Sequence, residues 1–215
     1  SEIYSSADWE VWDKQFRRYF MNALSGPKPL FLMGTKHSSG AGNLGLFSNI
    51  MHVGANPPTV AILFRPLSVP RHSYQHLMEQ KQATLNLVSE PMLHKAHLCA
   101  ASFPVGVSEF KEAGFAEEYI HAWQAPAVQE SPVQLGVRPV EEHRLEVNQT
   151  VLVVLQVDWI KLRGCGPEKD GFLDLQKLEA VSANGLDAYA GMKPVSKFLY
   201  AKPGRPVEEV DSFIP

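Results

Sequence analysis

Cysteine and long apolar runs are scarce in this chain of 215 residues. The two cysteines, Cys99 and Cys165, lie far apart and form no CxxC pair, which indicates a reducing compartment rather than a disulfide framework. No apolar run approaches the roughly 18 residues of a membrane span, and the polar, acidic beginning of the sequence is unlike a signal peptide. We therefore expect a cytoplasmic protein that does not enter a membrane.

Basic clusters and catalytic signatures are also missing. The formal net charge is −3, and Lys and Arg form no run or stripe, so we expect no nucleic-acid partner. His72 and His76, and likewise His94 and His97, are spaced to share a helix face. No cysteine or acidic cluster completes a zinc set, so we expect no metal. The sequence also has no G-x-S-x-G or Cys/His signature, and we predict no nucleophilic catalytic residue.

Apolar periodicity predicts a mainly β protein with peripheral helices. Short apolar or β-branched runs predict strands at residues 30–35, 59–64, 83–88 and 151–160. Apolar spacing predicts a long N-terminal helix at about residues 7–24 and shorter helices at 72–81, 92–101 and 108–113. Strands and helices do not alternate regularly, as a parallel sheet would require. We expect a single domain over residues 1–215.

The segment GAGNLG, Gly40 to Gly45, matches the dinucleotide-binding pattern G-x-G-x-x-G. That fingerprint needs a strand that ends at the first glycine and a helix that begins by the last. Here four polar residues separate the predicted strand from the glycines, and no Asp or Glu occurs between Gly45 and Glu79 to hold a ribose. A glycine-rich turn is therefore the better interpretation.

An ordered series of motifs runs through the middle of the chain. NLGLFSNIMHVGANPPTVAILFRP is followed by VPRHSYQHLMEQKQATLNLV, and SEFKEAGF (108–115) and GLDAYAGM (185–192) come later. Together these motifs resemble the flavin reductase-like family, whose members have the FMN-binding split-barrel fold. The resemblance covers roughly residues 25–200. Ser73 stands where a threonine is more usual, and His52 where many relatives have a small hydroxyl residue, so the role of His52 is open.

The resemblance implies an FMN-binding split β-barrel and a homodimer, because split-barrel flavin sites in this family lie at the subunit interface. It implies NADH or NADPH as hydride donor and a small molecule as electron acceptor. Carried over motif by motif, the cofactor-binding residues are Asn43, Leu44, Phe47, Ser48, Asn49, His52, Arg65 and Ser73.

The residue types suit this chemistry. A flavin phosphate carries close to two negative charges and needs hydroxyls, N–H groups and a cation. Ser48, Asn49, Ser73 and Arg65 would supply them. Each also has a plainer interpretation. Ser48 and Asn49 could satisfy a strand end, Arg65 could face solvent, and Ser73 could only cap the helix that follows. Phe47 suits the core in either case.

The sequence thus predicts an NAD(P)H-dependent flavin reductase or related FMN oxidoreductase, in which the cofactor carries the hydride chemistry and the protein positions it. Two alternatives stay open at this point. One is an FMN-binding electron carrier or sensor without nicotinamide turnover. The other is a split barrel that binds a different ligand, such as haem.

Overall fold

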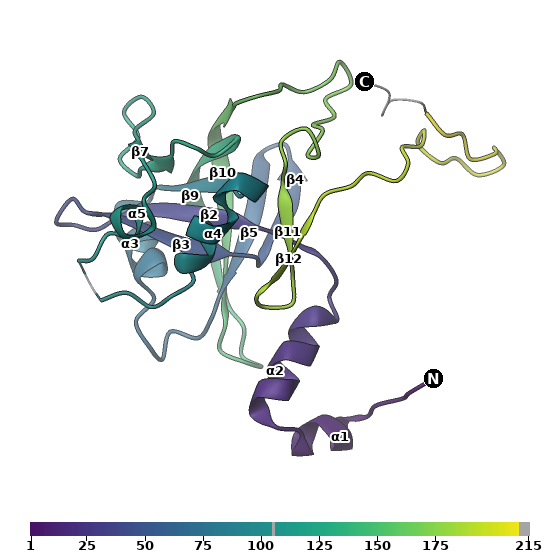
Figure 1. Ribbon diagram of the computed structural model, residues 1–215, viewed down its shortest axis with the longest axis horizontal. Helices are drawn as coiled ribbons and strands as arrows, with labels where there is room; N and C mark the ends of the chain where they lie inside the picture. Colours follow the sequence, from purple (N-terminus) through teal and green to yellow (C-terminus); the bar gives the residue numbers. More distant parts are fainter. Residues whose placement is uncertain (105, 211–215) are drawn as a thin grey trace.

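A computed structural model describes residues 1–104 and 106–210 of the chain. Its centre is one antiparallel sheet in the order β3-β2-β6-β9-β10-β5-β4 (Figure 1). In that order the strands are Gly42–Phe47, Phe31–Lys36, Ala83–Leu87, Val133–Arg144, Val151–Leu162, Pro58–Phe64 and Ile50–Ala55. The strands predicted at 30–35, 59–64, 83–88 and 151–160 correspond to β2, β5, β6 and β10.

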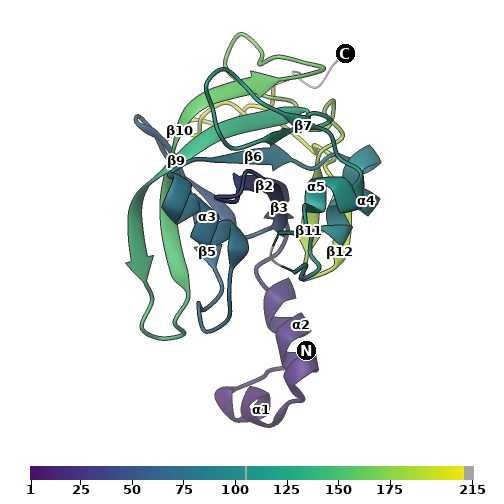
Figure 2. The ribbon, with the colours of Figure 1, turned by 90° about the vertical axis from the view of Figure 1, so that its left-hand side faces the viewer.

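The sheet has to curl because its two edge strands are consecutive in the chain. Strands β3 and β4 lie at opposite edges, yet only Ser48 and Asn49 separate them. A link this short spans at most about 10 Å, so the two edges must meet at a corner. Figure 2 shows the curl, with β9 and β10 arching over β6 and β2. No ladder joins β3 to β4 among the described residues, and the result is a split barrel.

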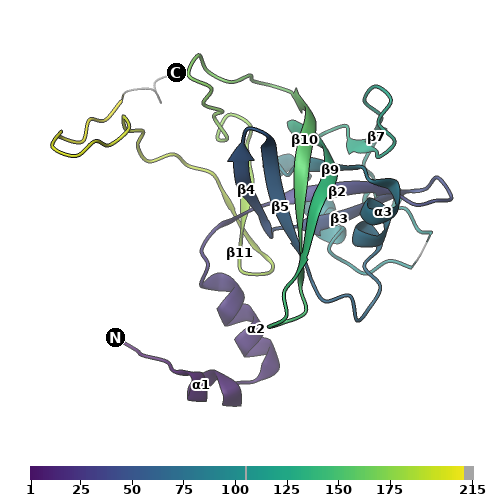
Figure 3. The ribbon, with the colours of Figure 1, turned by 180° about the vertical axis from the view of Figure 1, so that it is seen from behind.

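The barrel interior is filled by apolar side chains from nearly every strand. Val151, Val153 and Leu155 of β10 are buried at alternate positions, as expected for a strand with one face toward a core. Helix α3 (His72–Gln80) closes the interior with Leu77, which is fully buried. The long curved pair β9 and β10 is seen from behind in Figure 3.

A second apolar cluster lies on the outer face of β2 and β3. It joins Leu32 and Leu44 to Phe110 of α5 (Glu109–Ala113) and to Ala96 of α4 (Leu93–Leu98). A small sheet of β1 (Lys28–Pro29), β11 (Val181–Asn184) and β12 (Ala188–Gly191) packs there too. The remaining short pair is β7 (Glu117–Glu118) with β8 (Ala127–Val128). These elements form the peripheral layer of the mainly β fold.

The N-terminal segment is two helices rather than one. We predicted a single helix over about residues 7–24, but α1 (Ser6–Val11) and α2 (Lys14–Ala23) are separated at Trp12 and Asp13. The Asp13 carboxylate accepts from the backbone N–H groups of Gln15 and Phe16, so it starts a new helix instead of continuing the first. Both helices project away from the barrel (Figure 1), and neither contains a buried residue.

Two other predicted helices are confirmed in position and shorter than predicted. The segment at 92–101 is a 3₁₀ turn (Glu90–Met92) followed by α4, which ends at Leu98. Helix α5 ends at Gly114, whose φ of 69° is left-handed, as expected for a glycine stop. Within the described ranges, no helix combines the length and apolar content that a bilayer crossing needs.

The GAGNLG segment is neither a Rossmann loop nor simply a turn. Gly40 has φ of 96° and forms the turn after β2, while Gly42 and Gly45 lie within β3. A Cβ on Gly45 would stand 2.9 Å from the Ser73 hydroxyl and 3.0 Å from the Phe47 ring. The small residue lets the start of α3 approach the edge strand.

Candidate functional site

A cavity of about 330 Å³ lies at the corner where β3 turns into β4. Its walls come from β3, the end of β5, the start of α3, the segment after α4, and the turn between β11 and β12. Seven of the eight predicted cofactor residues line it: Asn43, Leu44, Phe47, Ser48, Asn49, Arg65 and Ser73. Segments far apart in the sequence thus meet at the gap in the barrel.

His52 is the predicted residue that does not line the cavity. It lies on edge strand β4, where the side chains of Met51, His52 and Val53 are exposed. Within one chain, His52 therefore has no place in the pocket.

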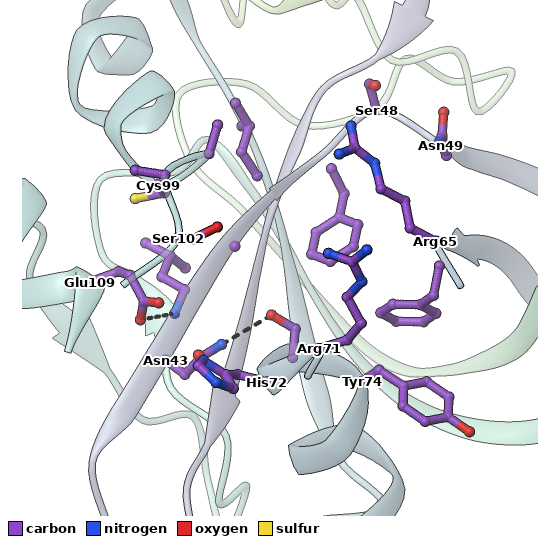
Figure 4. A pocket seen from close by; sticks show the side chains of 18 of the residues that line it. Asn43, Ser48, Asn49, Arg65, Arg71, His72, Tyr74, Cys99, Ser102 and Glu109 are labelled. Carbon is purple, nitrogen blue, oxygen red and sulfur yellow. Dashed lines mark hydrogen bonds between the residues drawn. The ribbon is translucent and has the colours of Figure 1, made fainter. Parts of the chain in front are cut away.

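One wall of the pocket is cationic. Arg65 is exposed and Arg71 half-buried, and both line the cavity. The Arg71 Nε donates to the carbonyl oxygen of Pro66 at 3.3 Å. Across the described part of the chain, neither guanidinium has an acidic partner. The turn before α3 folds Arg71 back along the same wall as Arg65 (Figure 4).

Ser73 lies in this pocket at the first turn of α3. The helix cap is Arg71, not Ser73, so the interpretation of Ser73 as a simple capping residue is wrong. Its Oγ accepts a hydrogen bond of 3.0 Å from Nδ2 of the buried Asn43. Ser73 and Ser48 therefore place two hydroxyls near the cationic wall.

The opposite side of the pocket holds Cys99, Ser102 and Glu109 (Figure 4). The Glu109 side chain is buried, and its Oε2 accepts from the Leu44 backbone N–H at 3.1 Å. Burial raises the pKa of this carboxyl, while the bond from Leu44 and the nearby His72 act to lower it. Burial and the neighbouring Glu109 raise the pKa of the Cys99 thiol to about 12, so Cys99 is a packed thiol rather than a nucleophile.

Aromatic rings line the base of the pocket beneath the cationic wall. The Phe47 ring lies 5.5 Å from that of Phe64, which in turn lies 5.3 Å from Tyr74, both edge to face. Leu44 is almost fully buried, so this residue contributes packing and backbone rather than an exposed side chain. An apolar base beside a polar rim is the usual form of a cofactor pocket.

Sequence reasoning missed Arg71, Tyr74 and Glu109 as pocket residues. Arg71 and Tyr74 lie within the RHSY motif quoted above, so the signal for them was present. Glu109 is 65 residues from Leu44 in sequence, and its contact depends on tertiary packing. The histidine pairs are not joined into a metal site, since residues 1–104 and 106–210 contain no group of three His, Cys, Asp or Glu side chains arranged to hold an ion.

The donor set of the pocket fits a flavin phosphate. Two guanidinium groups that have no acidic partner among the described residues converge there with two hydroxyls, and Gly45 leaves room for close backbone approach. Together, the fold and the pocket define a split-barrel flavoprotein of the oxidoreductase class. The chain belongs to the family of the flavin reductase like domain, whose model matches residues 24–177. The family resemblance and the split-barrel fold inferred from the sequence are thereby confirmed.

Solved structures support the same assignment. A candidate flavin reductase with a split barrel domain from Shewanella frigidimarina is 32% identical, with a TM-score of 0.90 over 94% of this chain and 100% of that one. Nitrilotriacetate monooxygenase component B from Bacillus cereus has a TM-score of 0.80 at 18% identity, over 91% and 98% of the two chains. An uncharacterized protein of Deinococcus radiodurans is 28% identical over 76% of this chain and 72% of its own length.

Proposed function

We propose that this protein binds FMN and catalyses NAD(P)H-dependent reduction of flavin or of another small electron acceptor. The observation that carries the proposal is the pair Arg65 and Arg71, which line the pocket beside the Ser48 and Ser73 hydroxyls and have no acidic partner within residues 1–104 and 106–210. Such a group of donors suits a terminal monophosphate, because charge-assisted hydrogen bonds to an anion are the strong ones. The 32% identity to a candidate flavin reductase supports the choice.

In this proposal the residues of the chain bind and orient the cofactor. Arg71, Arg65, Ser48 and Ser73 hold the phosphate, and Phe47 with Phe64 supports the aromatic base. When bound, FMN supplies the hydride acceptor at its N5 and stores the electrons. The protein would fix the phosphate end of the cofactor and leave access for the nicotinamide and then for the acceptor.

No side chain of the pocket is needed as a nucleophile in this proposal. The one thiol there, Cys99, keeps its proton at neutral pH because of its raised pKa, which removes it as a competing reactive group. Glu109 is the titratable carboxyl of the opposite wall. A ligand in the pocket would therefore lie between the wall of Arg65 and Arg71 and the carboxyl of Glu109.

Two measurements on the purified chain test the function. Titration with FMN, FAD and riboflavin should give the tightest binding for FMN, and equal binding of riboflavin would exclude a phosphate site. Rapid mixing of the FMN complex with NADH or NADPH should then bleach the flavin absorbance. Flavin binding without bleaching by either nucleotide would instead indicate an electron carrier or sensor. A preparation that takes up no flavin would contradict the proposal outright.

A further inference from the structure

A buried polar chain leads from the barrel interior to the pocket wall. Asn43 Nδ2 donates to Thr35 Oγ1 and to Ser73 Oγ, both at 3.0 Å. Thr35 is fully buried and its Oγ1 lies 3.4 Å from Nδ1 of His76, which is itself buried. The hydrogen-bonded order is therefore His76, Thr35, Asn43 and Ser73. Ser73 is the end of this series that lines the pocket. The dashed line that joins the labelled Asn43 to a hydroxyl in Figure 4 marks the last link.

The directions of these hydrogen bonds follow from the donors available. An amide has two N–H hydrogens, and Asn43 gives them to Thr35 and to Ser73. Each hydroxyl oxygen thus accepts one bond, and its own proton must point elsewhere. The Thr35 proton points to Nδ1 of His76 in the tautomer that carries the ring proton on Nε2. Residues 1–104 and 106–210 offer no acceptor for the Ser73 proton, which is left to face the pocket.

His76 is suited to the accepting role. It lies on the buried face of α3, where burial lowers its pKa, and the nearby His37 and His72 act in the same direction while Glu79 opposes them. A neutral imidazole can present one ring nitrogen as an acceptor. The 3.4 Å separation makes this the weakest link of the chain.

Packing also fixes where the Ser73 hydroxyl can lie. A Cβ added to Gly45 would approach Ser73 Oγ to 2.9 Å, so the β3 backbone stands directly beside it. With Asn43 on one side and Gly45 on another, the hydroxyl has little freedom to turn. Burial of such a polar chain is stabilising only when every member has its partner.

We infer that Thr35 and His76 are positioning residues that act through Asn43 to make Ser73 a hydrogen-bond donor to the phosphate of bound flavin. The inference rests on the proposed function. Thr35 lies inside the barrel and Ser73 on the pocket wall, so a purely structural role for Thr35 would affect all ligands equally. A positioning role affects the phosphate selectively.

The test compares FMN with riboflavin, which lacks the phosphate. The readout is the ratio of the two dissociation constants, from quenching of flavin fluorescence. Ser73→Ala should lower this phosphate selectivity about tenfold, the effect of one hydrogen bond to a charged group. Thr35→Val, which keeps the shape, should lower it about threefold, as a partial loss of that same bond. Thr35→Ser, which keeps the hydroxyl, should restore the wild-type ratio.

The double variant decides how Thr35 acts. Thr35→Val combined with Ser73→Ala should lose no more selectivity than Ser73→Ala alone, because Thr35 acts only through Ser73. His76→Leu removes the acceptor at the far end and should act in the same direction as Thr35→Val. This variant carries the test if circular dichroism shows that Thr35→Val does not fold.

Three results would overturn the inference. They are additive losses in the double variant, equal loss of FMN and riboflavin in Thr35→Val, or no rescue by Thr35→Ser. If the wild type binds FMN more tightly than riboflavin and the variants give any of these results, only the positioning role is contradicted. A wild-type ratio near one contradicts the phosphate site, and with it the proposed function.

Discussion

The two arginines of the pocket differ in burial, and this difference sets their expected contributions. Arg71 is half-buried, so Arg71→Ala should weaken FMN binding by about 1.5–3 kcal/mol, or roughly tenfold to a hundredfold. Arg65 is exposed and screened by water, so Arg65→Ala should cost about 1 kcal/mol or less. Riboflavin binding should hardly change in either variant. Fluorescence titrations measure this, with the exposed Arg205→Ala as control.

A different result would relocate the anion site. Equal weakening of riboflavin and FMN would mean that the arginines support the fold of the pocket rather than the phosphate. A larger loss in Arg65→Ala than in Arg71→Ala would mean that the phosphate lies at the Ser48 end of the wall.

Glu109 should make stability depend on pH. Its pKa is raised by burial, so the folded protein keeps this proton at higher pH than the unfolded chain does. The stabilisation is complete below the ordinary value of 4.5 and is lost as pH rises through the raised pKa. Glu109→Gln keeps an acceptor for the Leu44 N–H without a buried charge. The Tm of Glu109→Gln relative to that of the wild type should therefore increase from pH 4.5 to 7.5. The expected increase is about 2–4 °C for each kcal/mol of stability that the wild type loses over this range.

Thermal unfolding followed by circular dichroism across that pH range checks the sign. Glu112→Gln is the matched control, because Glu112 is exposed on the same short helix. If Glu109→Gln is instead most destabilised at pH 7.5, the carboxylate is stabilised by the nearby His72 more than burial opposes it.

At the scale of elements, the close packing of β2 depends on a glycine. A Cβ on Gly34 would overlap the carbonyl oxygen of Pro126 and stand 2.5 Å from the Thr84 hydroxyl. The backbone of the segment before β8 cannot give way cheaply, so Gly34→Ala should destabilise by about 1–3 kcal/mol. Gly191→Ala on β12, where a Cβ meets nothing within 4 Å, should be close to neutral. Urea unfolding of both variants tests this, and equal midpoints would contradict the packing argument.

The strands that could be predicted from the sequence are those with runs of apolar or β-branched residues, because such runs are buried. Runs such as 151–160 are rich in β-branched residues, and residues 151–156 alternate between buried and half-buried positions. Strands β3 and β4 were missed because one is rich in glycine and the other lies at an exposed edge. The acid-free stretch and the ordered motifs predicted most of the pocket. Glu109 could not be placed, since its contact with Leu44 depends on chain folding between distant segments.

At the scale of the whole molecule, much apolar surface is left uncovered. In α1 and α2, Val11 is 83% and Phe16 54% exposed, and on edge strand β4 Met51 is 57% and Val53 51% exposed. The extended C-terminal segment adds Val195 at 92% and Tyr200 at 91%, along with Phe198, Leu199 and Val207. The two terminal segments project from the barrel in Figure 1. Such surface is typical of a protein that associates with a partner.

We propose that a second copy of the chain covers this surface and completes the flavin site. The pocket opens beside Asn22 at the end of α2, and Tyr19 of the same helix donates to Asp187 at 2.6 Å, so the end of α2 borders the cavity. His52 on β4 would then meet the partner rather than its own pocket. An unpaired edge strand with apolar side chains is itself prone to association.

Sedimentation equilibrium should therefore show a homodimer at micromolar concentration. Val53→Arg and Phe16→Arg each place a charge on the apolar surface and should shift the protein toward monomer, by at least tenfold in dissociation constant if the residue is buried between copies. Val147→Arg, in the loop between β9 and β10, is the control for an exposed valine. Loss of bound FMN should accompany dissociation, because in this proposal the second copy completes the flavin site. A monomeric variant that still holds FMN at full occupancy would show that the site is complete within one chain.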